Sequence, residues 1–365
     1  LTALMGMVTK YSEIVLSIKY RERNDHGDWV GGPMYYIKNG MGKHWKWLGI
    51  LFCLFAMLAS FGIGNGAQAN SIVGSIYNAI TTFVPAADNA HSKFLISLVC
   101  GIVMAFLVAL ILFGGIKRIG AVTEKLVPFM SLFYILFTLI VIAAHAGNIG
   151  KAFQLIFASA FTPQAVLGAG SGILLKQTVI WGMRRSAFSN EAGLGSAAIA
   201  HAAADTKGPV EQGVFGIFEV FVDTIVICSL TALTIICSGV EIPFGVKPGS
   251  ELIMQAFATV FGARFASLFV AFALMLFAFS TILGWSLYGT RCTQFLFGLK
   301  ATKIFQGAFI VVVVLGSVAS LDTVWDVADT FNGLMAIPNF IAVFALSGVV
   351  AKETRKFFSN PLRRN

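Results

Sequence analysis

Apolar runs separated by short charged loops occupy almost the whole of this 365-residue chain. A run of roughly 20 such residues can cross a bilayer as a helix. About nine runs come near or above that length: 1–19, 47–82, 93–115, 126–146, 171–204, 211–239, 265–289, 303–319 and 331–351. A mixed stretch at 147–170 is typical of a helix on the membrane surface, and a short helix is expected around 250–262. The pattern predicts an all-α membrane protein, with residues 1–365 forming one domain.

Composition supports lipid as the main solvent. Hydrophobic residues make up 57% of the chain and charged residues 12%, and the mean hydropathy is +0.82. Soluble domains carry about 25% charged residues. The net charge of +9 comes from short basic clusters without the interleaved aromatic residues of a nucleic-acid surface. The five cysteines and five histidines lack metal-ligand spacing, and no catalytic set is evident, so we expect neither a metal centre nor an enzyme.

Lysine and arginine are unevenly divided between the loops. The loops at 19–46, 117–125, around Lys207, 291–303 and 352–364 hold most of them, whereas the loops that alternate with these hold few. Cytoplasmic loops of membrane proteins are rich in these two residues. We therefore expect a multi-pass protein of the cell membrane, with these five segments and the C-terminus in the cytoplasm.

The segment SNEAGLGSAA at 189–198 interrupts the fifth run. It places the amide of Asn190 beside the carboxyl of Glu191, followed by Gly193 and Gly195. An ionisable group at membrane depth is costly and marks a functional site by default. The glycines allow the backbone to unwind. The segment therefore predicts a broken helix that lines a polar cavity, the device with which transporters build solute and ion sites.

Other charged groups also lie inside apolar runs. Lys10 and Glu13 are one helical turn apart, so they are expected to neutralise each other. Asp223 needs a partner, for which Arg184 or Arg185 is available. Structural charge pairing is the favoured interpretation of these groups.

Asn65, Gln68 and Asn70 place three amides within six residues of an apolar run. Amides both donate and accept hydrogen bonds, so they suit the ammonium and carboxylate of an amino acid. Hydrogen bonds between helices would explain them without a ligand. The neighbouring glycines permit a small ligand to approach, which favours the first interpretation.

Ser280 and Thr281 place two hydroxyls in the middle of the run 265–289. Hydroxyl oxygens suit Na⁺, but in membrane helices they often bond to their own backbone, and their chemistry alone favours that alternative. Trp285 follows one turn later. It could cap a pocket or belong to the aromatic belt at the membrane surface, and its position alone favours the belt.

At this point the chain resembles a known family, the alanine or glycine:cation symporters, also called the sodium:alanine symporter family. The resemblance runs the whole length of the chain. It rests on five segments: GGPMYYI at 31–37, GNGAQANS at 64–71, SNEAGLGSAAIAHAAA at 189–204, VDTIVIC at 222–228 and FSTILGW at 279–285. Ser186 stands where the family pattern leads us to expect glycine.

The resemblance implies a LeuT-type fold, with two inverted five-helix repeats and alternating access. The chain then begins within the second core helix, as an N-terminally truncated fragment without the first, and is not expected to transport alone. The segment 171–204 becomes the broken sixth core helix. The family implies Na⁺ ligands at Ser280 and Thr281, and substrate contacts at Gln68 and Trp285. From their own chemistry we also expect substrate contacts at Asn65 and Asn70, and gating or helix-break roles for Asn190, Glu191, Gly193, Gly195 and Asp223.

The expected function is secondary active symport, in which Na⁺ entry drives uptake of a small neutral amino acid, alanine or glycine. Na⁺ is here a coupling ion and not a tightly bound cofactor. Membrane lipid is the expected surrounding, and neither a nucleic acid nor an obligate protein partner is expected. The alternatives are an ion or solute pore, an H⁺-coupled carrier and, least supported, an integral-membrane enzyme.

Overall fold

The computed structural model describes residues 2–161, 171–243 and 249–359, and these are almost entirely helical. The first half contains α1 (Thr2–Lys19), β1 (Glu22–Arg23), β2 (Trp29–Val30), α2 (Pro33–Tyr36), α3 (Lys46–Phe61), α4 (Ala67–Phe83), α5 (Ala90–Leu112), α6 (Gly115–Ala144) and α7 (Ile149–Phe161). The second half contains α9 (Ser171–Asn190), α10 (Ser196–His201), α11 (Pro209–Val220), α12 (Ser229–Ser238), α13 (Glu251–Phe261), α14 (Ala263–Phe297), α15 (Leu299–Val318), α16 (Leu321–Ala345) and α17 (Ser347–Phe358).

Short irregular turns join or interrupt these elements. Three of them are π-helical, at Ile37–Met41, Gly62–Gly66 and Phe221–Cys228, and three are 3₁₀-helical, at Lys43–Trp45, Pro85–Ala87 and Ala146–Asn148. The glycines at 62–66 do not split the long second run. They form a π-helical turn within one 41-residue helical stretch, Lys43–Phe83.

Within the described residues, six helical stretches are long and apolar enough to cross a membrane. The number rises to seven if α16 and α17, which meet at 56°, are counted as one bent span. The expected short helix near 250–262 is present as α13. The expected surface helix at 147–170 is present as α7 as far as Phe161, and its remainder, 162–170, lies outside the described residues. These findings support a multi-pass membrane protein.

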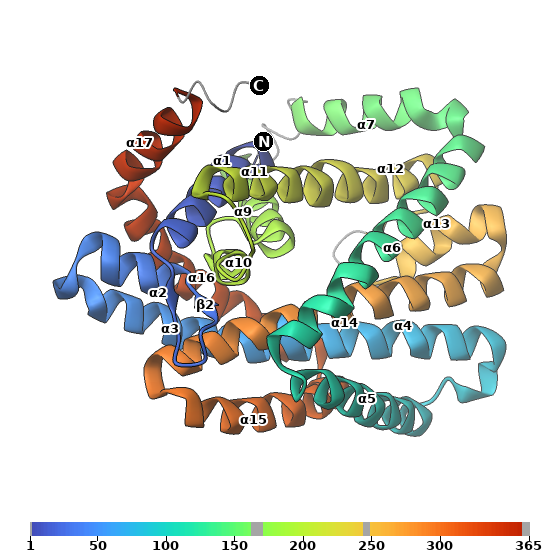
Figure 1. Cartoon of the computed structure of the whole chain (residues 1–365). Coiled ribbons are helices and arrows are strands. Elements are labelled where there is room, and N and C mark those ends of the chain that lie inside the picture. Colours follow the sequence, from blue (N-terminus) through green and yellow to red (C-terminus); the bar gives the residue numbers. More distant parts are fainter. Residues whose placement is uncertain (1, 162–170, 244–248, 360–365) are drawn as a thin grey trace.

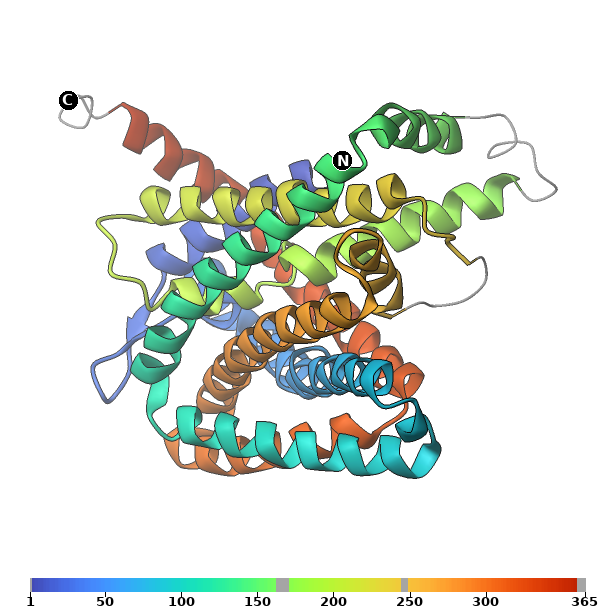
Figure 2. The ribbon, with the colours of Figure 1, turned by 90° about the vertical axis from the view of Figure 1, so that its right-hand side faces the viewer.

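The helices form two groups in Figure 1. The upper part of the view holds α1, α9, α10, α11 and α12, and the lower part holds α4, α5, α14 and α15. In the first group α1 packs along α11, and in the second α14 packs against α4 and α15. Figure 2 shows the same division after a quarter turn. The helix α14 therefore faces the upper group on one side and its own group on the other.

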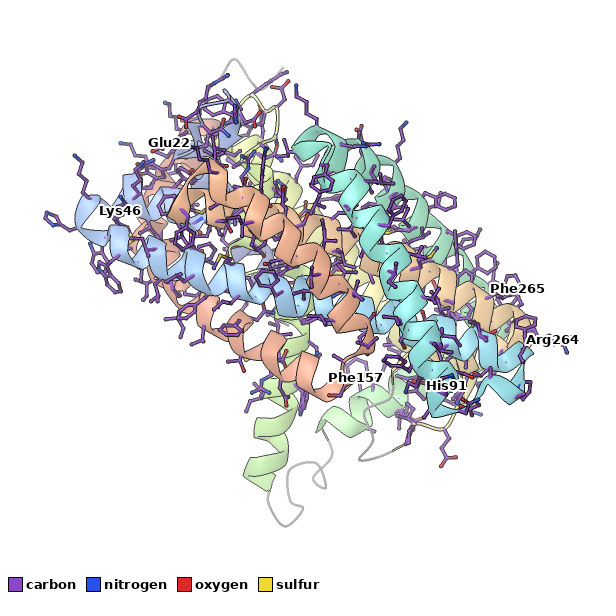
Figure 3. All side chains as sticks on the ribbon, turned by 90° about the horizontal axis from the view of Figure 1, so that it is seen from below. Glu22, Lys46, His91, Phe157, Arg264 and Phe265 are labelled. Carbon is purple, nitrogen blue, oxygen red and sulfur yellow. The ribbon has the colours of Figure 1, made fainter. Side chains whose placement is uncertain are left out.

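Large apolar side chains are exposed on the outer helices. Phe106 on α5, Phe113 just after its end and Leu132 on α6 are more than three-fifths exposed. Figure 3 shows side chains projecting outward around the whole helical body, including Phe265 at the start of α14. Large apolar side chains in such positions are expected where hydrocarbon, and not water, surrounds the protein.

Close backbone contacts bring the π-helical turn at 62–66 against the second group. A Cβ added to Gly64 would lie 2.1 Å from the Cβ of Trp285, and one added to Gly316 would lie 2.4 Å from the Cα of Gly66. Small residues at helix crossings permit such approach in membrane proteins. Trp285 consequently sits at the junction of α14 with α3 and this turn, and it is 1% exposed.

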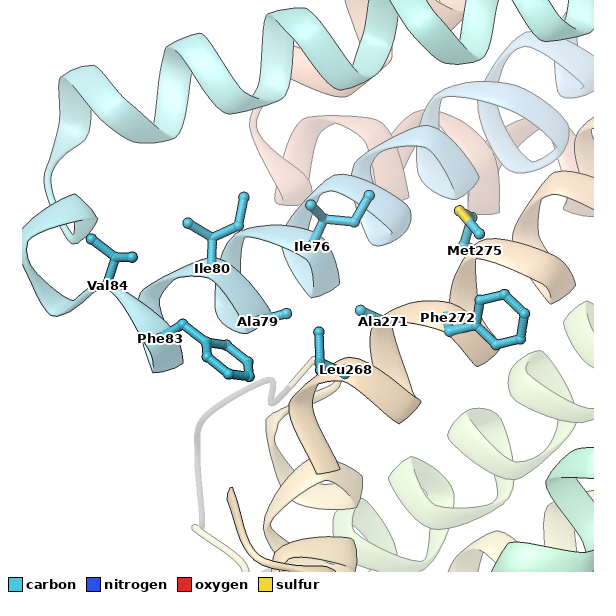
Figure 4. Close-up of a pocket in the computed structure, with 9 residues that line it drawn as sticks. All are labelled: Ile76, Ala79, Ile80, Phe83, Val84, Leu268, Ala271, Phe272 and Met275. Carbon is cyan, nitrogen blue, oxygen red and sulfur yellow. The ribbon is translucent and has the colours of Figure 1, made fainter. Parts of the chain in front are cut away.

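A groove of about 380 Å³ separates the ends of α4 and α14 (Figure 4). We call it the apolar groove. It is lined by Ile76, Ala79, Ile80, Phe83, Val84, Leu268, Ala271, Phe272 and Met275. Every lining side chain is apolar, so the groove offers almost no hydrogen-bonding partner.

Candidate functional site

A second cavity, of about 270 Å³, lies between the two helix groups, and we call it the polar cavity. Helices α1, α6, α9, α10, α11 and α14 contribute to it. It is lined by Lys10, Thr123, Val127, Ser189, Asn190, Glu191, Ala197, Ala200, His201, Glu219, Asp223, Ser280, Thr281, Gly284, Trp285 and Tyr288. Several of these side chains are ionisable, in contrast to the lining of the apolar groove.

The helix that the sequence predicts at 171–204 is interrupted beside this cavity. Helix α9 ends at Asn190 and α10 begins at Ser196. Between them the backbone takes positive φ at Glu191 (57°), Gly193 (91°) and Gly195 (75°). The two glycines are also sterically required, because an added Cβ would approach Phe340 to 2.5 Å and Pro33 to 2.4 Å, respectively. These features form the helix break, which we define as residues 191–195.

The carboxylate of Glu191 faces the polar cavity. The hydroxyl of Ser196 donates to it over 2.7 Å and so spans the break. Trp285 and Tyr288 pack edge to face, with ring centroids 5.4 Å apart, on the side of the cavity that this carboxylate faces. The only non-glycine residue with positive φ among the described residues thus places its charge opposite the aromatic wall.

Asp223 lies in the π-helical turn after α11 and receives hydroxyl donors. Ser189 donates to it over 2.6 Å and Thr224 over 2.9 Å. The predicted pairing with Arg184 or Arg185 is replaced by these bonds, because Arg185 turns instead to Asp329 at 3.2 Å. Short hydroxyl donors, one on α9 and one on the residue after Asp223, reach the carboxylate with less loss of side-chain freedom than a long arginine.

Lys10 does not pair with Glu13 as the sequence spacing predicts. Its ammonium lies 2.9 Å from Glu219 on α11 and donates to the backbone carbonyl of Asn190 at 2.9 Å. Both acceptors of the Lys10 ammonium thus lie on other helices, and neither is a residue of α1. The local pairing is therefore wrong, and Lys10 joins α1 to α11 and the end of α9.

The charge network continues from Glu219 to a histidine. His201 Nε2 lies 2.9 Å from Glu219, and the Gln212 amide nitrogen lies 2.8 Å from His201 Nδ1. An amide NH₂ can only donate. His201 Nδ1 is therefore the acceptor, and Nε2 carries the proton that it donates to Glu219.

Ser280 and Thr281 both line the polar cavity. Both hydroxyls donate to the carbonyl of Phe277, over 2.7 and 3.1 Å. A hydroxyl that donates its proton keeps its oxygen lone pairs for another partner. The backbone bonding and the cation-binding interpretation are thus compatible in this geometry.

The three amides of α4 and the preceding turn lie outside this cavity. Asn65 donates to the Phe309 carbonyl over 2.7 Å, and Asn70 to the Ala319 carbonyl over 2.8 Å, both toward α15 and its end. Gln68 donates to the carbonyl of Ile63 over 3.0 Å. In this arrangement the amides of Asn65 and Asn70 hold helices together, and their contact with a substrate stays a prediction.

The structure therefore brings together Asn190, Glu191, Asp223, Ser280, Thr281 and Trp285, with Gly193 and Gly195 shaping the break. Sequence reasoning did not place Lys10, His201, Glu219 and Tyr288 in the site. Two signals were present: Glu219 is an acidic residue within an apolar run, and Tyr288 follows Trp285 by three residues, which places it on the same helix face.

Comparison with known proteins identifies the group to which this arrangement belongs. The sequence model of the sodium:alanine symporter family matches residues 1–364. The sodium/alanine symporter AgcS of Methanococcus maripaludis is 43% identical over the whole chain, which covers 77% of that protein.

Two relatives from Bacillus subtilis extend the comparison. The amino-acid carrier protein AlsT is 36% identical over 97% of this chain and 71% of its own length. The probable sodium/glutamine symporter GlnT is 35% identical over 95% of this chain and 68% of its own length. With a match across nearly every residue, the chain belongs to the sodium:alanine symporter family.

Proposed function

We propose that the polar cavity is where this symporter binds alanine and Na⁺. Family membership establishes the general activity: the protein is a transporter that couples Na⁺ to alanine uptake, and it is not an enzyme. The observation that carries the location is that Ser280, Thr281 and Trp285 line one cavity with the helix break. Broken helices at membrane depth are where transporters build solute and ion sites, and here the break lies beside polar side chains that a zwitterion or an ion can contact.

Each group has a chemical role in this proposal. The hydroxyl oxygens of Ser280 and Thr281 are hard ligands that suit Na⁺. Trp285 forms the wall that excludes larger side chains. Such exclusion is limited to about 1–3 kcal/mol per methylene, so substrates related to alanine and glycine are expected to compete. Asn190, Glu191 and Asp223 set the geometry of the break and the inner gate.

We further propose that Gln68, Asn65 and Asn70 contact the substrate in another conformation of the transporter. The turn that precedes Gln68 packs directly on Trp285 through Gly64. A shift of the indole would therefore join the polar cavity to this group of amides. Alternating access requires movement of this kind between states that bind the ligands differently.

We propose a LeuT-type inverted-repeat architecture with about nine spans in one domain, residues 1–365. The helix break facing α14 across a polar cavity supports it, because this is how such folds build midplane sites. The basic loops support a cytoplasmic C-terminus. In this proposal lipid surrounds the outer faces of the helices, and no obligate protein partner takes part.

The principal test is Thr281→Ala in the full-length gene product, measured as Na⁺-dependent alanine uptake into proteoliposomes. We expect the Na⁺ concentration for half-maximal uptake to rise about tenfold, as for the loss of one ligand to a charged group. Thr290→Ala is the matched control, because Thr290 also lies on α14 and bonds its own backbone, at Ser286, outside the cavity. An unchanged Na⁺ dependence in Thr281→Ala would remove this residue from the ion site.

A second measurement separates a symporter from a pore and assigns the ion. Unlabelled alanine inside the vesicles should accelerate entry of labelled alanine, which a pore would not show. Uptake should cease when Na⁺ is removed. Uptake that persisted without Na⁺ and collapsed with a protonophore would instead identify an H⁺-coupled carrier.

A further inference from the structure

Helix α1 carries a row of buried polar side chains on one face. Lys10, Glu13, Ser17 and Arg21 follow one another at spacings of three or four residues, which places them along a single side of the chain as it leaves the helix. Lys10, Glu13 and Ser17 are 6%, 0% and 0% exposed. We call these four residues the polar stripe. Only Lys10 belongs to the lining of the polar cavity.

The polar stripe faces the backbone of the broken helix, and the contacts run in the same order along both segments. Lys10 donates to the carbonyl of Asn190 over 2.9 Å, and Ser17 to that of Ala198 over 2.6 Å. Arg21 donates to the carbonyls of Ala202 and Ala204 over 3.1 and 2.8 Å. The stripe therefore contacts the end of α9, the body of α10 and the chain beyond α10.

Glu13 stands opposite the gap between these contacts. Its Oε1 accepts a hydrogen bond from the Asn339 amide of α16, and the same amide donates to the Gly193 carbonyl over 2.8 Å. The Asn339 oxygen in turn accepts from the hydroxyl of Tyr36. The backbone of Gly193 and Gly195 lies beside the Glu13 carboxyl, whose Oε2 is buried without a hydrogen-bond partner among the described residues.

The chemistry of the stripe matches the needs of a broken helix. A helix end leaves carbonyls without partners, and a helix start leaves N–H groups without partners. Lys10, Ser17 and Arg21 are placed against carbonyls and act as donors. Glu13, which can only accept when ionised, is placed against the stretch where α10 begins. At membrane depth no water replaces these partners, so the match bears directly on the conformation of the break.

We infer that the polar stripe is a template that holds residues 190–204 in their broken conformation, and that Glu13, through Asn339, is the positioning residue for the helix break. Because Asn190 and Glu191 line the polar cavity on one side of this template, its loss alters the affinity for alanine and Na⁺. This consequence rests on the proposed function. The inference that the stripe fixes the conformation of the break is independent of the proposed function.

Ser17→Ala and Ser12→Ala provide a matched pair on α1. Ser12 bonds the Val8 carbonyl of its own helix and takes no part in the stripe. In uptake by the full-length gene product, Ser17→Ala should raise the KM for alanine and the half-maximal Na⁺ concentration about threefold or more, with kcat changed less, as expected for one lost hydrogen bond. Ser12→Ala should match the wild type. Equal values for the two variants would overturn the inference.

Glu13→Ala and Glu13→Gln test the centre of the stripe. The glutamine oxygen can still accept from Asn339, so Glu13→Gln should stay within about threefold of the wild-type KM, whereas Glu13→Ala should exceed about tenfold. Rescue by glutamine would show that hydrogen bonding positions the break. An alanine variant with the wild-type KM, or a glutamine variant as impaired as alanine, would contradict it.

Hydrogen exchange gives a readout that needs no transport. In the purified full-length protein, the backbone amides of residues 191–198 should exchange faster in Glu13→Ala and Ser17→Ala than in the wild type or Ser12→Ala. Unchanged exchange would overturn the template even if transport were altered. Conversely, if exchange were faster in the two variants but the wild-type protein failed to take up alanine with Na⁺, the proposed function would be overturned and the template would stand.

Discussion

The polar cavity and the apolar groove lie along the same helix, α14, yet only the polar cavity is lined by charged and hydroxyl side chains. Thr281, Trp285 and Tyr288 face the polar cavity, whereas Leu268 and Phe272 face the groove. Their volumes are comparable, about 380 Å³ for the groove and about 270 Å³ for the polar cavity. Volume therefore does not distinguish the two.

The difference lies in what each surface offers to a zwitterion. Transfer of an unpaired charge into apolar surroundings is very costly. The groove, with Ala79 and Ala271 among its apolar lining residues, has no group to offset that cost. The polar cavity has carboxylates and hydroxyls beside the helix break. The comparison teaches that polar side chains gather at one of the two hollows along α14, whereas the other is lined by apolar side chains alone.

Replacing Trp285 should have the largest effect on this contrast. Trp285→Ala removes the aromatic wall of the polar cavity, so we expect at least a tenfold rise in the KM for alanine and competition by larger neutral amino acids. The measurement is uptake of labelled alanine with unlabelled competitors. Phe272→Ala, an aromatic truncation on the groove face of the same helix, is the control and should change neither value. Equal effects of the two variants would show that the polar cavity and the apolar groove do not differ in their contribution to transport.

Lys10→Met should have the second-largest effect, which is a loss of folding stability. The variant leaves Glu219 without its ammonium partner, and we expect the free energy of unfolding to fall by about 1–3 kcal/mol. Thermal unfolding in detergent measures it. The double variant Lys10→Met/Glu219→Gln should recover part of this loss, because no unpaired charge remains. A double variant less stable than Lys10→Met would show that Glu219 is stabilised chiefly by other groups.

Narrowing the apolar groove should have only a small effect on alanine transport. Ala271→Leu adds three carbons to its lining, and we expect the KM for alanine and the Na⁺ dependence to stay within about twofold of the wild type, since the added carbons occupy a groove that is not part of the proposed site. Proteoliposome uptake is the measurement, with the thermal midpoint as a check on folding. A tenfold rise in the alanine KM would make the groove part of the transport path.

The smallest effect is expected at Glu22, in the hairpin between α1 and α2 and outside the spans. Partial burial raises the pKa of Glu22, but hydrogen bonds from Lys38 and Asn39 outweigh it and hold the pKa below its ordinary value. A depressed folded-state pKa stabilises the protein above the ordinary glutamate range, and this contribution disappears as the pH falls through the folded-state pKa.

The measurement is the thermal midpoint of the wild type and Glu22→Gln at neutral and acidic pH. The wild type should be slightly more stable at pH 7, and the two midpoints should converge toward about pH 4 and below, on the acid side of the ordinary glutamate pKa. A difference that stayed constant over this range would show that the carboxylate charge of Glu22 makes no contribution.

Local chemistry made part of this molecule predictable. Two glycines beside an amide and a carboxyl predict an interruption in an apolar run, and α9 and α10 are separated at 191–195. The length of the apolar runs likewise predicts long helices such as α14. In both cases the cause lies within a few consecutive residues, because backbone conformation and side-chain polarity are local properties.

Partner choice was not predictable in the same way. Lys10 has Glu13 one turn away, but binds Glu219 and the Asn190 carbonyl instead. Asp223 has arginines in a neighbouring segment, but accepts from Ser189 and Thr224. A buried polar group takes whichever partner the packing brings within about 3 Å, and the spacing along one helix contains no information about that packing.

The sequence alone therefore determined the membrane class of the protein, most of its helices, the place where one helix breaks and, through its motifs, the family. The tertiary structure decided which polar groups share a cavity, and it separated Asn65, Gln68 and Asn70 from Ser280, Thr281 and Trp285 in this conformation. The physical reason is that apolar length and glycine flexibility act within a segment. Hydrogen bonds and ion pairs at membrane depth depend instead on which helices the fold places face to face.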